Sequence, residues 1–373
     1  MTLTGRLLEG IKYSQNEVYS FLSNVIEQNS YGHAYLFLGP SGSGKLEAAR
    51  ALAQGILCSN SCCGICDDCQ RVARDTHPDL HTLSPQSAQG YLIGQIRDLI
   101  NDLDYKPMLS QHKVYILNDA QNLTPSSANA LLKSLEEPPG SVVFILLGTS
   151  GDAILPTIVS RCQTITFKPV SHETMVLALT SELGILPEKA CEALSCCTSL
   201  EQARSFLGSV PRQNARKFAL DCFTNLSRAD SQELLNRAKK AVQAAKDIVA
   251  DYKESSETLV NEQAKLLSKT AIHDLEEQQK REIAQRERMA YKEQLHAMRS
   301  LLRDSLTLQC GYCEQPTCPD FINTSKEIAQ LLCPTSITKA LQYIQSCIEA
   351  LEANATPLLA YEALLMKIQR LYC

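Results

Sequence analysis

The stretch AYLFLGPSGSGKL, residues 34–46, decides the fold of the first part of the chain. Five apolar residues lead into a glycine-rich turn, and a helical pattern follows from about Lys45 to Ile56. The turn at 39–46 matches the phosphate-binding pattern G-x-x-x-x-G-K-[ST] except at its last position, which holds Leu46. Backbone N–H groups of such a turn and the helix dipole both point at phosphate. The stretch therefore predicts a nucleotide-binding α/β domain.

The residues predicted to hold phosphate are Gly39, Gly42, Gly44 and Lys45, with the lysine reaching the β- and γ-phosphates. Leu46 has no oxygen for magnesium, which normally takes a serine or threonine hydroxyl there. We therefore expect weak binding of ATP or ADP. The alternative interpretation is a purely structural turn.

A second departure lies in the apolar segment HKVYILND, residues 112–119, which has the form of an acidic Walker B strand. Asn118 occupies the position of the magnesium carboxylate, and Asp119 occupies that of the base that polarises water. Phosphoryl transfer depends on neutralising the developing charge on phosphate. Because both oxygen ligands are replaced, we expect the chain's own ATPase activity to be absent or weak.

Further strands are predicted at 79–83, 114–117, 142–147 and 164–167, and helices alternate with them. This alternation favours an α/β fold with a mainly parallel sheet, over residues 1–169. No convincing strand follows, so 170–210 is predicted to be a small helical domain and 211–373 a helical bundle. The charged stretch 230–300 remains open among an extended arm, a partner-docking coiled coil and a disordered tether.

Composition limits the classes of function. The chain has 373 residues, 44% of them hydrophobic and 21% charged, with a formal net charge of -5, which argues against a protein that coats nucleic acid. No apolar run reaches the roughly 18 residues of a membrane span, and the N-terminus lacks the pattern of a signal peptide. These features predict a cytoplasmic protein, in which the 16 cysteines form no stable disulfides.

Five of those cysteines lie within residues 58–69. Cys63, Cys66 and Cys69 form C-x₂-C-x₂-C, and Cys58 completes a four-thiolate set typical of structural Zn²⁺. Cys62 is a rival fourth ligand, although adjacent residues rarely turn both side chains to one metal. Free thiols are the alternative. Cys310, Cys313 and Cys318 form a second group with less regular spacing, and whether it binds a second metal is left open by the sequence.

Several motifs together resemble the bacterial DNA polymerase III clamp-loader subunits, which are AAA+ proteins with a zinc-bearing insert. The motifs are GHAYLFLGPSGSGK (32–45), CGICDDCQ (63–70), THPDL (76–80), KVYILNDA (113–120), ANALLKSLEEPP (128–139) and SRC (160–162). They occur in the order and spacing of that family, densely over residues 30–168. The segment NATPLLAYEALLM at 354–366 resembles the collar domain that ties such subunits into a ring.

The resemblance implies an AAA+ domain with a zinc module, a helical lid at 170–210 and a collar at 211–373. The changes at Leu46 and Asn118 resemble the delta-prime type, whose own nucleotide site is often degenerate. Thr149 lies where the family places a sensor hydroxyl. Arg161 of the SRC motif matches the arginine that projects toward the ATP of a neighbouring subunit.

The implied function is that of a stator within DNA polymerase III, supplying Arg161 in trans to a gamma/tau ATPase. The implied partners are the gamma/tau and delta subunits in a hetero-oligomeric ring and, through that ring, the sliding clamp and primed DNA. No membrane partner is expected. Two alternatives remain open: a catalytically active gamma/tau-like ATPase, and a zinc-containing DNA-binding protein.

Overall fold

The computed structural model of the chain describes residues 6–12, 14–60, 62–87, 90–138, 140–263, 269–311 and 316–372. Two compact units make up the chain, Met1–Ala178 and Leu179–Cys373. The finer division into 1–169, 170–210 and 211–373 stays a prediction. Among the described helices, none combines the length and the apolar character needed to cross a bilayer.

The first unit contains a five-stranded sheet in the order β2-β3-β4-β1-β5, and all of its pairings are parallel. The strands are β1 (Ala34–Leu38), β2 (Leu80–Leu83), β3 (Lys113–Leu117), β4 (Val142–Gly148) and β5 (Gln163–Thr166). Every strand predicted from the sequence is confirmed, with ends that differ by at most one residue. Parallel strands buried on both faces read as continuous apolar runs, which is why these segments were recognisable.

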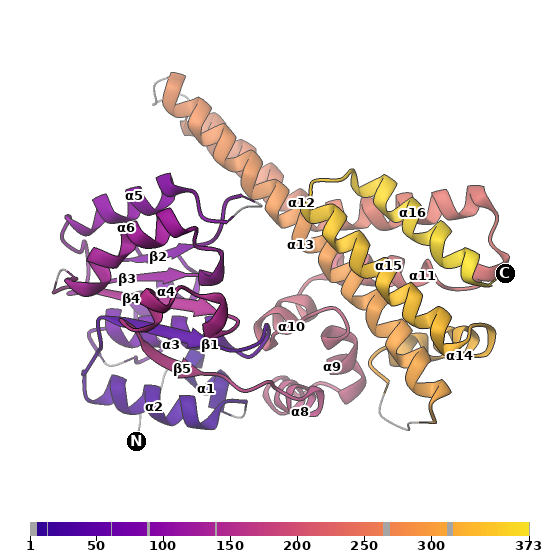
Figure 1. Ribbon diagram of the computed structural model, residues 1–373, viewed down its shortest axis with the longest axis horizontal. Coiled ribbons are helices and arrows are strands. Elements are labelled where there is room, and N and C mark those ends of the chain that lie inside the picture. Colours follow the sequence, from indigo (N-terminus) through magenta and orange to yellow (C-terminus); the bar gives the residue numbers. More distant parts are fainter. Residues whose placement is uncertain are drawn as a thin grey trace. The chain divides into compact units, whose positions relative to one another are not determined.

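Helices cover both faces of the sheet (Figure 1). One face carries α1 (Arg6–Lys12), α2 (Asn16–Glu27) and α3 (Lys45–Leu57), and the other carries α5 (Ile93–Leu103), α6 (Pro125–Glu136) and α7 (Pro156–Val159). Alternate residues of β1 point to opposite faces, so Tyr35 and Phe37 join the first core and Leu36 joins the second. The sheet thus separates two apolar cores.

The helix after β3 has both ends defined by local chemistry. Thr124 caps α6 by accepting a hydrogen bond from the backbone N–H of Ser127, and Pro125 occupies the first turn. The helix ends at Glu136, just before Pro138. Pro125 and Pro138, both visible in the sequence, therefore mark the two ends of this helix.

All strands lie in the first unit, and helices joined by short loops make up the described residues of the second unit. The boundary between the units falls within α8 (His172–Leu183). The later helices are α9 (Pro187–Leu194), α10 (Leu200–Leu207), α11 (Val210–Asp221), α12 (Ser231–Gln263), α13 (Lys269–Gln309), α14 (Ile322–Leu331), α15 (Pro334–Glu352) and α16 (Pro357–Gln369).

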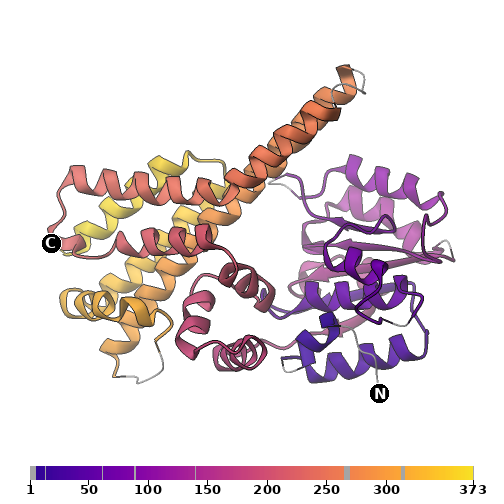
Figure 2. The same cartoon turned by 180° about the vertical axis from the view of Figure 1, so that it is seen from behind.

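Helices α12 and α13 form a long antiparallel pair, which Figures 1 and 2 show side by side from opposite directions. The Arg286 guanidinium lies 3.7 Å from the ring centroid of Tyr252, a cation–π contact across the pair. The described parts of 230–300 are thus helical, which favours the arm and coiled-coil interpretations over a tether. Residues 264–268 lie outside the described part of the chain.

One buried amide joins four helices of this unit. Gln294 of α13 donates hydrogen bonds from Nε2 to the carbonyls of Ala215 in α11 and Ala241 in α12, at 3.1 and 2.8 Å. Its Oε1 accepts a hydrogen bond of 2.8 Å from the hydroxyl of Tyr361 in α16. Because Gln294 and Tyr361 are almost fully buried, these bonds satisfy groups that water does not reach.

Candidate functional site

The predicted nucleotide residues lie where parallel strands end. The glycine-rich loop follows β1, Asn118 and Asp119 follow β3, and Thr149 follows β4. Since β3, β4 and β1 are neighbours in the sheet, these positions share its carboxyl edge. Ligands of open α/β sheets bind at this edge. The fold therefore brings the predicted nucleotide-binding residues together at the carboxyl edge of the sheet.

The loop glycines serve two different geometric needs. Gly42 and Gly44 have φ of 78° and 87°, in the left-handed region that favours glycine. Gly39 meets the backbone at close range: a Cβ on it would lie 2.7 Å from the carbonyl oxygen of Phe167. Its N–H also donates to the carbonyl of Gly148, at 3.2 Å. The loop therefore has a defined path between the ends of β4 and β5.

Lys45 folds back over the loop. Its Nζ donates hydrogen bonds to the carbonyls of Gly39 and of Pro40, the latter at 2.8 Å. Burial lowers the pKa of Lys45, and the charges of Asp119 and Glu47 offset that effect in part. The ammonium is therefore positioned beside the loop that it is predicted to serve.

Leu46 packs on the apolar core formed by α1, α2, α3 and the sheet. Its side chain is partly buried. A threonine at this position is smaller and would keep only part of these contacts, so Leu46 contributes to the packing of the domain.

The end of β3, where a Walker B strand carries acidic residues, also departs from the expected pattern. The Asn118 side chain donates from Nδ2 to the hydroxyl of Ser84, at 3.0 Å. Asp119 is exposed, adopts φ of 50°, and accepts a hydrogen bond from Gln121 at 3.2 Å. Thr149 is exposed immediately after β4. Of these side chains only Asp119 carries a charge suited to a cation, and its field reaches Lys45.

Arg161 lies just after α7 and is paired within its own subunit. Its Nε donates to Oε1 of Glu136 at 2.6 Å, and a second guanidinium nitrogen contacts the same oxygen. The guanidinium also donates to the carbonyl of Thr157, at 2.9 Å. About a third of the Arg161 side chain, 32%, is exposed. Glu136 is not among the site residues predicted from the sequence, so this pairing adds a residue to the candidate site.

The cysteine cluster begins at the C-terminal end of α3. The Sγ atoms of Cys58, Cys63, Cys66 and Cys69 all lie within 4.8 Å of one another. Cys58 is 3.6 Å from Cys66 and 3.9 Å from Cys63, and Cys63 is 3.9 Å from Cys69. Tetrahedral Zn²⁺ with Zn–S bonds of about 2.3 Å requires S···S separations of about 3.8 Å. The four thiols therefore fit a zinc ion.

Backbone N–H groups surround the same sulfurs. Gly64 donates to Cys69 at 3.3 Å, while the N–H groups of Cys66 and Cys69 donate to Cys63 and Cys66, each at 3.4 Å. Burial raises the pKa of Cys69 and of Cys66. A dication would offset the cost of gathering thiolates in this site.

The remaining cysteines are not part of this cluster. Cys62 has φ of 61°, is buried, and donates from Sγ to Oε1 of Gln54 at 3.3 Å. The structure therefore places Cys58, and not Cys62, with the other three. Cys313 lies outside the described residues. Cys310 is exposed and Cys318 buried, and no second cluster of possible metal ligands occurs in the described part of the chain.

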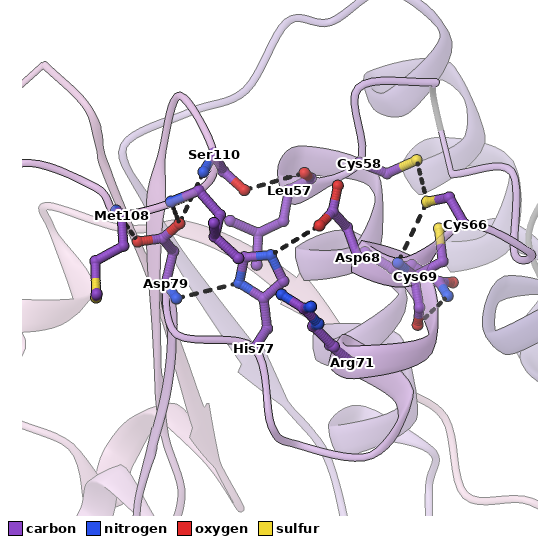
Figure 3. A network of polar contacts seen from close by, with 12 residues as sticks. Leu57, Cys58, Cys66, Asp68, Cys69, Arg71, His77, Asp79, Met108 and Ser110 are labelled. Carbon is purple, nitrogen blue, oxygen red and sulfur yellow. Dashed lines mark hydrogen bonds and ion pairs between the residues drawn. The ribbon is translucent and has the colours of Figure 1, made fainter.

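A network of polar contacts, not predicted from the sequence, links the cysteine module (residues 58–69) to the sheet (Figure 3). Its members come from three segments: Asp68 in α4 (Asp67–Ala73), His77 and Asp79 before β2, and the loop before β3. His77 and Asp79 are almost fully buried. The motif THPDL at 76–80 was the available signal, since a buried histidine and aspartate need defined partners.

Two family models match successive parts of the chain. The model of the family "DNA polymerase III, delta subunit" matches residues 14–171, and that of "DNA polymerase III, delta subunit, C terminal" matches 257–370. DNA polymerase III subunit delta' of Bacillus subtilis is 38% identical over 43% of this chain and 50% of its own length. The delta' subunit of Pseudomonas aeruginosa is 41% identical over 35% of this chain and 42% of its own.

Subunit tau of Bacillus subtilis is also similar, at 34% identity over 43% of this chain and 29% of its own length. The chain thus spans half or less of the length of these curated relatives. Both delta-subunit models fall in order along the chain, one on each unit. Together these matches support a DNA polymerase III clamp-loader subunit of the delta-prime type, related to gamma/tau.

Proposed function

We propose that the chain is a stator of the DNA polymerase III clamp loader, which hydrolyses little or no ATP itself and supplies Arg161 to a neighbouring ATPase subunit. Its partners would be gamma/tau and delta subunits in a hetero-oligomeric ring. Through that ring it would act on the sliding clamp and primed DNA. The observation that carries the proposal is the replacement of both magnesium oxygens, at Leu46 and Asn118, beside an otherwise intact phosphate loop.

The degenerate site supports binding without turnover. The loop of Gly42 and Gly44 and the N-terminus of α3 can hold phosphate through backbone N–H groups alone. Rapid hydrolysis needs a metal to neutralise the transferring phosphoryl group, and Leu46 and Asn118 do not provide its ligands. ATP or ADP at Lys45 would then bind weakly and without turnover.

Arg161 suits a role in trans because its present partner is easily exchanged. The Glu136 side chain is 47% exposed, and such exposed ion pairs contribute only about 0–1 kcal/mol. A γ-phosphate carries more charge than a carboxylate and accepts a guanidinium bidentately. Transfer of Arg161 from Glu136 to a neighbour's ATP would therefore cost little.

The test is the DNA-stimulated ATPase rate of the reconstituted loader with Arg161→Ala. Arginine fingers contribute about 10³–10⁵-fold in well-studied GTPases, so the single site served by Arg161 should lose nearly all of its turnover. Arg74→Ala, at an exposed position of the same unit, is the matched control and should leave the rate unchanged. Unaltered turnover with Arg161→Ala would refute the finger.

The ATPase activity of the isolated chain distinguishes the stator proposal from the alternative of an active ATPase. Purified without other subunits, it should show no ATPase activity above that of Lys45→Ala. A brisk rate that Lys45→Ala abolishes would instead support a gamma/tau-like ATPase.

We also propose that Cys58, Cys63, Cys66 and Cys69 bind one structural Zn²⁺. Four sulfur ligands close the coordination shell, so the ion would stabilise the module and would not bind substrate. Metal analysis of the purified chain tests this: one zinc per chain is expected.

A further inference from the structure

His77 connects the cysteine module to the strand that follows it (Figure 3). Its Nδ1 accepts a hydrogen bond of 3.1 Å from the backbone N–H of Asp79, so a neutral ring carries its proton on Nε2. That nitrogen has no hydrogen-bond partner among the described residues and lies 3.6 Å from Oδ1 of Asp68 on α4, a distance at which the carboxylate attracts the ring proton without forming a hydrogen bond. Since Cys66 caps α4 and Cys69 lies within it, the partner of His77 belongs to the helix that carries two of the cluster's thiols.

Asp79 extends the connection to a loop far along the chain. Its carboxylate, 0% exposed, accepts hydrogen bonds from the N–H groups of Met108, Leu109 and Ser110, at 2.5, 2.8 and 2.8 Å. Burial by itself would raise the pKa of Asp79, but these three amides lower it below the ordinary range. Asp79 is thus held as a carboxylate that orders the loop backbone.

A second connection returns from the loop to the cysteines. The hydroxyl of Ser110 donates to the carbonyl of Leu57 at 3.1 Å, and Leu57 is the last residue of α3, directly before Cys58. The module and the loop are therefore joined at both ends of the cysteine segment.

The loop held in this way presents apolar side chains to solvent. Tyr105, Met108 and Leu109 are 71%, 76% and 56% exposed. Their backbone is ordered by buried hydrogen bonds while their side chains are free of the core. An ordered loop with exposed apolar side chains loses less conformational entropy on binding than a flexible one.

We propose that Asp68, His77 and Asp79 are positioning residues that make the order of the loop 105–110 depend on metal in the cysteine module. The inference rests on the proposed zinc site. Helix α4 has only 7 residues, too few to persist alone, so loss of the metal would release Asp68 and the end of α3 together. The surface of Tyr105, Met108 and Leu109 is then presented in one conformation only by the metal-loaded chain.

Hydrogen exchange of the full chain tests the inference, with zinc content measured on the same samples. Removing zinc with a chelator should speed exchange of the amides of Met108, Leu109 and Ser110 by about tenfold or more. Amides of β5, at the opposite edge of the sheet from β2, should exchange as before and so report on global stability. Unchanged exchange at 108–110 after verified loss of zinc would overturn the inference alone; a chain that binds no zinc would overturn the metal site as well.

Variants separate the individual connections. Asp79→Asn should speed exchange at 108–110 while zinc stays bound, because the loop loses its anion and the module keeps its ligands. His77→Leu should speed zinc release to a chelator several-fold, and His77→Gln, which keeps a donor and an acceptor, should restore part of the difference. Asp67→Asn, at an exposed position of the same helix turn, is the control for lost helix-end charge. Asp68→Asn should speed zinc release and exchange at 108–110, as expected if Asp68 supports His77. If Asp67→Asn matched Asp68→Asn in both measurements, the His77 connection would be refuted.

Discussion

The two ends of α3 carry two candidate binding sites that differ in how they are built. At its N-terminus, Gly44 and Lys45 offer backbone N–H groups and one ammonium, but Leu46 faces the core. At its C-terminus, Cys58 begins a set of four thiols whose spacing fits one zinc ion. The same helix therefore joins a site without its metal-ligand oxygens to a site with a complete ligand set.

The difference shows that anion binding and metal binding separate readily. A phosphate cradle is made by the backbone, so it persists as long as the turn and helix fold. A metal site is made by side chains, and each ligand is lost by one substitution. An intact glycine-rich loop is thus evidence of fold, whereas we propose that magnesium binding depends on oxygen ligands at positions 46 and 118.

The largest effect is expected at the cysteine end. Cys66→Ser with Cys69→Ser should reduce bound zinc from one per chain to nearly none, since structural zinc contributes about 10–16 kcal/mol of binding free energy in small domains. Metal analysis and thermal unfolding measure the change. Cys62→Ser is the matched control, because Cys62 is turned toward Gln54 and should leave the zinc content unchanged.

Asp79→Asn should cost about 3 kcal/mol of unfolding free energy at pH 7, as a buried carboxylate with three amide donors is lost. The pKa of Asp79 is lowered in the folded state, so its stabilisation is complete above the unfolded pKa of about 3.9 and is lost as the pH falls through the folded value. Urea unfolding should show a constant difference from pH 5 to 8 that shrinks below pH 4. Asp104→Asn, at an exposed position, should show neither effect.

At the other end of α3, Gly39→Ala should destabilise the chain by about 2 kcal/mol, because the new Cβ would lie 2.7 Å from the Phe167 carbonyl oxygen. Gly94→Ala, where a Cβ meets nothing within 4 Å, should be neutral or slightly stabilising. Denaturant unfolding compares the two. Equal stability of both variants would mean that the loop glycine serves phosphate alone.

The smallest predicted effect is a gain in affinity for ATP. Leu46→Thr with Asn118→Asp restores both oxygens and should raise the Mg²⁺-dependent affinity for ATP by about tenfold, or about 1.4 kcal/mol. Isothermal titration with and without Mg²⁺ measures it. Leu46→Thr alone should gain less and lose stability, because its packing on the core is removed. No gain from the double variant would place the cause of weak binding elsewhere in the loop.

Much of this arrangement was predictable because its signals are local. Continuous apolar runs predicted the strands, Pro125 and Pro138 marked the ends of α6, and the spacing of Cys63, Cys66 and Cys69 predicted a cluster. The rival roles of Cys58 and Cys62 were distinguished only by the backbone, since φ of 61° turns Cys62 away.

The contacts that the sequence did not reveal join distant residues. Arg161 meets Glu136 across 25 positions, and Asp79 meets the amides of 108–110 across 29 to 31. Backbone amides leave no mark on side-chain pattern, so the partner of a buried carboxylate is visible only once the chain is folded. The arrangement of residues 230–300 could not be decided from the sequence either, because a charged helical stretch is compatible with an arm, a coiled coil or a tether.

The amide of Gln294 has a consequence for how the second unit assembles. Its partners Ala215, Ala241 and Tyr361 lie 79, 53 and 67 positions away, so no two neighbouring helices can satisfy it alone. Bringing such distant segments together costs loop-closure entropy before the bonds form. The bundle should therefore fold late and all at once, and a partly assembled bundle would carry an unsatisfied polar group at its centre.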